Sequence, residues 1–237
     1  MIRAFLRDED RILSLNYDIG ELSGALENPA DLLWLDLAHE EIEVIEPILI
    51  EHFHFHPLAI DDALHETHTP KVDDWRSYLY VVLRAAVLEA NGAVEVQMPE
   101  LDVFLGENFL VTYSWEPVTA VDRVWDVCQM DERLLTRGPD VLLYRLADEL
   151  ATEAVEIVEL MLINLDAIEE EIFGDASPDT LEDLFTLKRN ALKMRRIAGP
   201  QRDVMQKLSR NEYAVIDDVD RVFFRDVYDH LVGLNDK

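Results

Sequence analysis

The chain has 237 residues, of which 49% are hydrophobic, and its 50 acidic against 21 basic side chains give a formal net charge of −29 with His neutral. This composition predicts a folded chain with a sizeable core and excludes a disordered tail. The acidic excess argues against nucleic acid and anionic lipid as partners, because both are polyanions, and favours cations. A solvated acidic surface is the commoner explanation of such a charge. A single cysteine, Cys128, precludes an internal disulfide and is typical of a reducing compartment.

Membrane spans and secretory signals leave a clear mark in hydropathy. The longest apolar stretch, residues 78–83, is interrupted by Arg84, and no run approaches the roughly 18 residues that a bilayer span needs. The first residues also lack the long apolar core of a secretory signal. The sequence therefore predicts a soluble chain.

The first 135 residues mix signals for strands and helices. Segments rich in β-branched and aromatic residues, or bounded by turn residues, predict strands at 2–6, 31–37, 77–89, 94–98, 101–105 and 108–115. Apolar residues at helical spacing predict helices at 18–25, 40–52, 56–65 and 121–129. Asn91-Gly92 is a hairpin signal between two of these strands, and Gly106-Glu107 separates another pair.

From Pro139 onward the pattern is helical. Asp140 is the predicted N-cap of a helix that reaches Phe173, a rod of roughly 50 Å at 1.5 Å per residue. We predict a turn at 174–178, a returning helix at 179–210 that bends at Gly199-Pro200, and a last helix at 217–234. The whole is an α/β (α+β) fold, with a mixed sheet and flanking helices in an N-terminal domain, residues 1–135, and a long projecting helical hairpin at 136–215.

Two clusters early in the chain carry metal-ligand chemistry. His52, His54 and His56 would share one face of a strand, but the surrounding pattern is helical, and on a helix these side chains diverge. Asp61 and Asp62 are adjacent on a predicted helix and point about 100° apart, so they cannot both bind one ion unaided. A solvated helix face is the usual explanation for such a pair.

A third cluster lies near the end of the chain, where Asp226 and His230 are four residues apart and share a helix face. The pair can place two ligands on one cation, or it can form a simple side-chain hydrogen bond.

Sequence motifs of enzymes give less support than these clusters do. The sequence has no phosphate-binding loop, no dinucleotide-binding glycine turn and no nucleophile elbow, and Cys128 has no activating context, which argues against an enzyme.

The segment HPLAIDDALHETHTPKVDDWRSYLYVVLRA, residues 56–85, resembles the signature region of CorA-type magnesium and cobalt transport proteins. Further similar segments follow in the expected order at 100–115, 140–150, 184–196 and 223–231. The most specific are HPLAIDD with the later TPKV, and FRDVYDH.

The resemblance implies a homopentamer whose cytoplasmic α/β domain carries a helical hairpin and a stalk helix that continues into the membrane. The pore then ends in a Gly-Met-Asn loop, and this chain stops at Lys237 without that motif. Residues 216–237 are expected to be the start of the stalk helix, and the missing C-terminal helices are the expected connection to the membrane. The expected place of the full-length protein is the inner membrane, with this portion on its cytoplasmic face.

The resemblance also implies regulatory divalent-cation sites between neighbouring subunits. Asp62 falls at the position that faces Asp226 of the adjacent subunit, and a second site would draw on Asp61, Asp148 and His230. Asp61 stands where a Glu is familiar in the family, and its side chain is one methylene shorter than that of Glu. The implied ligand is Mg²⁺, with Co²⁺ or another divalent cation able to substitute, and its binding is expected to favour the closed pentamer.

Two alternatives stay open. The zinc-transporting, ZntB-like branch shares the architecture, and the histidines at 52–56 suggest zinc, whereas the TPKV and FRDVYDH strings favour magnesium. The other is a stand-alone metal-dependent hydrolase that uses His56, Asp61 and Asp62. A hydrolase needs ligands that converge inside one subunit, and the long hairpin has no role in it.

Overall fold

The computed structural model describes residues 1–7, 12–15, 22–65, 67–91, 93–174, 177–210 and 213–235. The strands are β1 (Ile2–Arg7), β2 (Ile12–Leu15), β3 (Leu32–Ala38), β4 (Lys71–Asp74), β5 (Leu79–Arg84), β6 (Val87–Asn91), β7 (Ala93–Gln97), β8 (Glu100–Leu105) and β9 (Phe109–Ser114). The α-helices are α1 (Leu22–Glu27), α2 (Ile42–Glu51), α3 (Pro57–His65), α4 (Thr119–Met130), α5 (Pro139–Phe173), α6 (Pro178–Arg210) and α7 (Arg221–Asn235).

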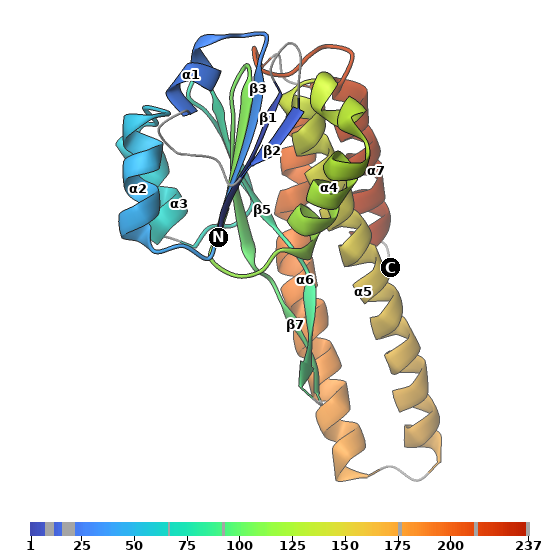
Figure 1. The fold of residues 1–237 in the computed structure, drawn as a ribbon. Helices are drawn as coiled ribbons and strands as arrows, with labels where there is room; N and C mark the ends of the chain where they lie inside the picture. Colours follow the sequence, from blue (N-terminus) through green and yellow to red (C-terminus); the bar gives the residue numbers. More distant parts are fainter. Residues whose placement is uncertain are drawn as a thin grey trace.

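The molecule has three layers, with a seven-stranded sheet in the middle. Helices α2 and α3 cover one face, α4 to α7 cover the other, and α5 and α6 extend far beyond the sheet as a helical pair (Figure 1). The strand order is β2-β1-β3-β9-β8-β5-β4, in which β3 and β9 are parallel and every other neighbouring pair is antiparallel. The predicted fold class, a mixed sheet with flanking helices followed by a long helical hairpin, is confirmed.

Covering both faces of the sheet creates two hydrophobic cores. Trp34 and Leu105 face the cluster that includes the helices α4 to α7, whereas Leu35 and Phe104 face the cluster under α2 and α3. All seven residues of β3 are buried, because this strand is central and covered on both sides. That explains why DLLWLDL reads as an apolar run rather than as an alternating pattern.

The predicted strand at 77–89 is in fact two strands. The chain leaves the main sheet at Ala85 and Ala86, where the Arg84 amide donates to Gln201 Oε1 of α6 and the Ala85 amide donates to the Pro99 carbonyl oxygen. Strands β6 and β7 then form the hairpin that Asn91 indicated, with Asn91 opposite Ala93. This hairpin lies along α6 (Figure 1).

Side chains of α6 hold the hairpin in place. Lys193 Nζ lies 2.8 Å from Glu95 Oε1 and donates to the Val96 carbonyl oxygen at 3.0 Å. Asn190 Oδ1 accepts from the Val96 amide at 3.1 Å. The contact therefore combines an ion pair with hydrogen bonds between side chains of α6 and the backbone of β7.

Several boundaries differ from the predicted ones. The last helix begins at Arg221 rather than 217, because residues 217–220 form a turn in which the Asp220 amide donates to the Asp217 carbonyl oxygen. The returning helix begins at Pro178 rather than 179 and is continuous through Gly199 and Pro200, where the predicted bend stays a prediction. Helix α1 begins at Leu22, and the earlier part of the predicted helix at 18–25 lies outside the described residues. Strands β2 and β4 have no counterpart among the predicted strands.

Asp140 is not the N-cap of α5. The N-cap is Gly138, and the Asp140 carboxylate instead accepts from the Val141 amide at 3.0 Å and from the Asp217 amide at 3.0 Å. Asp140 is buried, and burial raises its pKa, although both amides lower it. The side chain thus joins the start of α5 to the turn before α7.

Gly138 is a position where a side chain is strained. Its φ is +119°, and a Cβ there would lie 2.8 Å from Asp140 Oδ1. We expect Gly138→Ala to lower the free energy of unfolding by about 1–3 kcal/mol, measured by urea denaturation. Gly233→Ala is the matched control, because nothing lies within 4 Å of a Cβ there and alanine favours the helix. Equal stability of the two variants would contradict this account of Gly138.

Candidate divalent-cation site

The structure brings three of the predicted ligands together on the face of α7 that meets α5. One ligand atom each from Asp148, Asp226 and His230 lies within 4.8 Å of the others. Phe224, Val227 and Leu231 are buried, and they set the rotation of α7. Asp226 and His230, one turn apart, remain exposed beside Asp148 of α5.

Asp148 is the most enclosed member of the group. Its side chain is 20% exposed, and His230 Nδ1 lies 3.9 Å from its Oδ1. Burial raises the pKa of Asp148 and neighbouring Asp226 raises it too, whereas Arg145 and His230 lower it. Two carboxylates and an imidazole are a donor set that suits a divalent cation, since carboxylates suit Mg²⁺ and imidazole suits Co²⁺, Ni²⁺ and Zn²⁺.

The other two predicted ligands lie on α3, on the opposite side of the sheet from α7 (Figure 1). Asp61 is exposed, with its Oδ1 3.2 Å from His65 Nδ1. Asp62 is half-buried, accepts a short hydrogen bond from Lys71 Nζ, and lies 3.7 Å from His68 Nε2. Within the described part of one chain, neither residue joins the group on α5 and α7.

Two basic residues that the sequence analysis did not single out share the carboxylates of these sites. Lys71 contacts Asp62 and lies 3.1 Å from Asp73, and although burial opposes it, these contacts raise the pKa of Lys71. Arg145 Nη1 lies 3.3 Å from Asp148 Oδ2. The second contact was readable as a salt bridge between residues three apart on one helix. The first depends on strand β4, which was not predicted.

Two of the three histidines at 52–56, His54 and His56, take local structural roles. His54 Nδ1 lies 3.0 Å from the Ile50 carbonyl oxygen, and His54 has a φ of +52°. His56 Nδ1 accepts from the Leu58 amide at the start of α3, and its ring stacks on Trp75 with centroids 4.3 Å apart. None of the three belongs to a group of metal-type ligands among the described residues.

Cys128 is fully buried, which raises the pKa of its thiol to about 12.

A second acidic group, Asp140, Asp217 and Asp220, lies where α5 and the turn before α7 meet. Two of its three carboxylates already have partners in the chain, because Asp140 accepts from two backbone amides and Asp220 Oδ1 lies 2.7 Å from Arg137 Nη2. These contacts join the start of α5 to the turn before α7, so they give the group a structural role.

The layered sheet with its extended helical pair is a fold already known from solved protein domains. The chain shares its fold with the soluble domain of CorA from Methanocaldococcus jannaschii, with a TM-score of 0.83 and 18% identity over 100% of this chain and 90% of that one. The cytoplasmic domain of ZntB from Vibrio parahaemolyticus also has this fold, with a TM-score of 0.73 and 12% identity over 99% of this chain and 88% of that one.

The chain belongs to the family described as CorA-like Mg²⁺ transporter protein, whose model matches residues 29–237. It is 28% identical over 203 residues to the YfjQ protein of Bacillus subtilis, covering 86% of this chain and 62% of that protein. It is 27% identical over 187 residues to the cobalt/magnesium transport protein CorA of Thermotoga maritima, covering 78% of this chain and 53% of that protein. The chain therefore spans little more than half the length of these relatives.

Hydropathy adds one finding. Among the helices that the structure describes, none combines the length and the apolar character that crossing a bilayer requires.

Proposed function

We propose that this chain is the cytoplasmic, divalent-cation-sensing portion of a CorA-type Mg²⁺/Co²⁺ channel, in which Mg²⁺ bound between subunits favours a closed homopentamer. Membership of the CorA-like family supports the transport role. The observation that carries the sensing role is the gathering of Asp148, Asp226 and His230 within 4.8 Å, because it gives the family's cargo a donor set on the surface of this chain.

The residues fit such a ligand. Mg²⁺ keeps several of its waters and is commonly bound through one or two carboxylates, which Asp148 and Asp226 supply. Both acids lie beside cationic or neutral nitrogen groups, with Arg145 next to Asp148 and His230 next to both. A divalent cation there would neutralise the two carboxylates, and Arg145 would be released from Asp148 or share it.

A second copy is needed to complete the arrangement. Asp61 and Asp62 lie on α3, across the sheet from Asp226 on α7, so a cation that joins the two sets must join two chains. Each chain also brings a formal charge of −29 to the assembly. Bare carboxylates that face each other across a boundary repel, and a bridging cation converts that repulsion into attraction.

The energetic demand on each site is small. A cation biases the assembly only through its differential affinity for the closed state. A preference of about 1 kcal/mol at each of five sites totals about 5 kcal/mol, close to the 5.5 kcal/mol that shifts a population from 1:99 to 99:1. Weak sites are therefore sufficient, and weak sites can respond to changes in cellular Mg²⁺.

Calorimetric titration of this chain with MgCl₂ tests the site. We expect Asp148→Asn with Asp226→Asn to weaken binding about tenfold or more, a loss of at least about 1.4 kcal/mol, because both carboxylates are removed from the donor set. Asp229→Asn is the matched control, since Asp229 lies on the same helix, is exposed and is not in the group. Sedimentation of the same samples with and without Mg²⁺ reports the assembly.

Three results would contradict the proposal. Equal loss in Asp229→Asn would show that only the overall charge matters. Unchanged binding in the double variant would remove the site. Binding of Zn²⁺ but not Mg²⁺ or Co²⁺ would favour the ZntB-like branch instead.

A further inference from the structure

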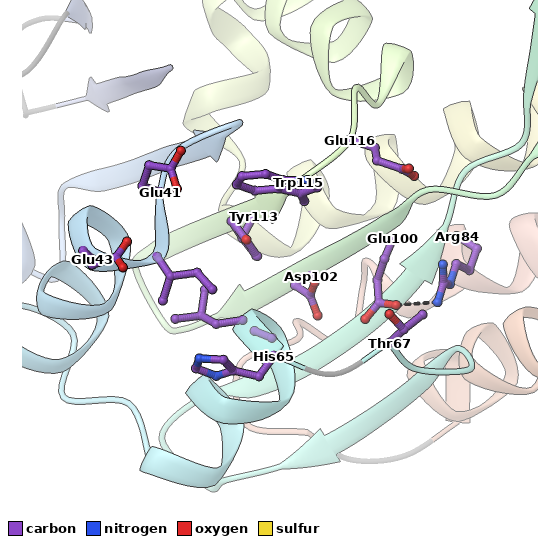
Figure 2. Close-up of a pocket in the computed structure, with 13 residues that line it drawn as sticks. Glu41, Glu43, His65, Thr67, Arg84, Glu100, Asp102, Tyr113, Trp115 and Glu116 are labelled. Atoms are coloured by element: carbon purple, nitrogen blue, oxygen red, sulfur yellow. Dashed lines mark hydrogen bonds and ion pairs between the residues drawn. The ribbon is translucent and has the colours of Figure 1, made fainter.

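A large cavity opens between α2, α3 and the ends of β8 and β9, apart from the candidate cation site. Its volume is about 620 Å³. Figure 2 shows Asp102 and Tyr113 projecting from the sheet into this space, with Glu41 and Glu43 on the α2 side and Glu100 with Arg84 at the other end. Five carboxyl groups and one guanidinium line it: Glu41, Glu43, Glu100, Asp102, Glu116 and Arg84.

Asp102 is the unusual member of this lining. The residue is only 2% exposed, yet it lines the cavity. Its Oδ1 accepts from the Tyr80 hydroxyl at 2.6 Å, and within the described residues its other oxygen has no hydrogen-bond donor. Burial raises its pKa well above the usual range, and nearby Glu100 adds to this, while Tyr80, Arg84 and Lys71 oppose it. An ammonium group beside this carboxyl would favour its ionised form and oppose the rise in pKa, so the open oxygen on the cavity is suited to receive a cationic donor.

The single guanidinium does not neutralise the cavity. Arg84 donates to the carbonyl oxygens of His68 and Met98 and pairs with Glu100 Oε2, so it is fixed in the wall. Glu100 Oε1 is buried without a hydrogen-bond partner, 3.8 Å from His68 Nδ1. The wall therefore retains acceptor capacity at Glu100 as well as at Asp102.

The rim adds exposed charge and an aromatic surface. Glu41, Glu43 and Glu116 are exposed at the mouth, and Trp115 is 55% exposed beside them. An indole face binds cations through its quadrupole, and it also packs against methylene groups. Ile42 and Leu64 contribute further apolar surface. The cavity is therefore lined by both acidic and apolar side chains.

These acids do not form a metal site. Neither of the two groups of converging metal-type ligands among the described residues includes a residue of this cavity. A compact ion requires ligands around one point, whereas these carboxyl groups are spread from the α2 side to Arg84 (Figure 2). Separated acceptors with apolar surface between them match a ligand whose positive charges are separated by methylene segments.

We propose that this cavity binds a linear aliphatic polyamine, with one ammonium group donating to Asp102 and Glu100 in the wall and another held at the rim by Glu41, Glu43 and Trp115. The methylene segments then lie against Ile42, Leu64 and the indole. The site is distinct from the candidate Mg²⁺ site on α5 and α7 and does not depend on it.

Calorimetric titration of this chain with spermidine in 150 mM NaCl tests the proposal. We expect Asp102→Asn, which can still accept from Tyr80, to weaken spermidine binding about tenfold or more. The surface double variant Glu43→Gln with Glu116→Gln should also weaken it, by severalfold, and it keeps the test valid if Asp102→Asn does not fold. Glu51→Gln is the matched control, because Glu51 ends α2, the helix that carries Glu43. It is exposed and does not line the cavity.

Butylamine, with one charge, should bind much more weakly than spermidine at the same ionic strength. Equal losses in Glu51→Gln and the cavity variants would overturn the proposal, because they would indicate attraction to the net charge alone. A Mg²⁺ binding signal that disappears in Asp102→Asn, without spermidine binding, would also overturn it, because the cavity would then be a metal site.

Discussion

Replacing Arg3 with methionine is expected to lower the free energy of unfolding by about 3–5 kcal/mol, because it leaves a buried carboxylate without its cation. Arg3 Nε donates to Asp36 Oδ2 at 2.8 Å, and the Asp36 side chain is only 1% exposed. Burial raises the pKa of Asp36, although Arg3 and Thr112 lower it. Without Arg3 the carboxyl must remain charged in the core or take up a proton.

The packing around Asp36 makes this cost difficult to relieve. Thr112 donates to Asp36 Oδ1 at 2.7 Å and accepts from Trp34 Nε1 at 3.2 Å, which links two central strands. The Arg3 guanidinium carbon also lies 4.4 Å from the ring centroid of Trp125. Relaxation of one member therefore disturbs a hydrogen-bonded network between the sheet and α4.

Urea denaturation of two further variants and a pH series checks this prediction. Arg3→Met with Asp36→Leu should recover most of the loss, since no charge remains buried. The deficit of Arg3→Met should also shrink toward acidic pH, where Asp36 becomes protonated. A deficit below about 1 kcal/mol at neutral pH, or one independent of pH, would show that the pair behaves like a surface ion pair.

Periodicity and turn chemistry explain the parts of the fold that the sequence predicts well. Helix α5 ends at Phe173, the predicted last residue, because its apolar positions keep the helical period until Gly174. The hairpin at Asn91 is likewise a local signal. The order of the strands in the sheet cannot be predicted from such local signals. The parallel pairing of β3 with β9 joins segments more than 70 residues apart, and no local pattern encodes it.

The candidate site was predictable only in part. Asp226 and His230 share a helix face, which their spacing shows, and the family resemblance added Asp148. The basic residues that contact the predicted ligands were harder to predict from the sequence. Lys71 reaches Asp62 from a short strand with the sequence KVDD, which has no alternating apolar pattern and was not predicted. The sequence can therefore show which residues are candidate ligands, whereas the charged groups that contact them depend on the tertiary structure.

Glu153 is the second position where a large effect is expected, because its carboxyl is buried between α5 and α4. The residue is 6% exposed, and its Oε2 is buried without a hydrogen-bond partner. Arg123 Nη1 lies 3.5 Å from Oε1 but is also 2.8 Å from Glu149 Oε1, so its charge is shared. Burial raises the pKa of Glu153 to about 7, Arg123 opposes this, and Glu149 and Glu156 add to it.

A raised carboxyl pKa in the folded state makes stability fall as pH rises. Below the unfolded value of about 4.5 the group is protonated in both states, and between 4.5 and about 7 only the folded state holds the proton. Between pH 5 and pH 8 this group alone should remove about 2–3 kcal/mol of stability, since each pKa unit corresponds to about 1.4 kcal/mol. Glu153→Gln cannot lose that proton and should escape this loss.

Urea denaturation at pH 5 and pH 8 measures the difference directly. The unaltered chain and Glu153→Gln share every other titrating group, so the change in their stability difference between the two pH values isolates Glu153. Glu156→Gln, exposed and one turn closer to the tip of the hairpin, should change that difference by less than about 0.5 kcal/mol. Parallel pH curves for the unaltered chain and Glu153→Gln would mean that Arg123 keeps Glu153 ionised throughout, and that the contact between α4 and α5 is insensitive to pH.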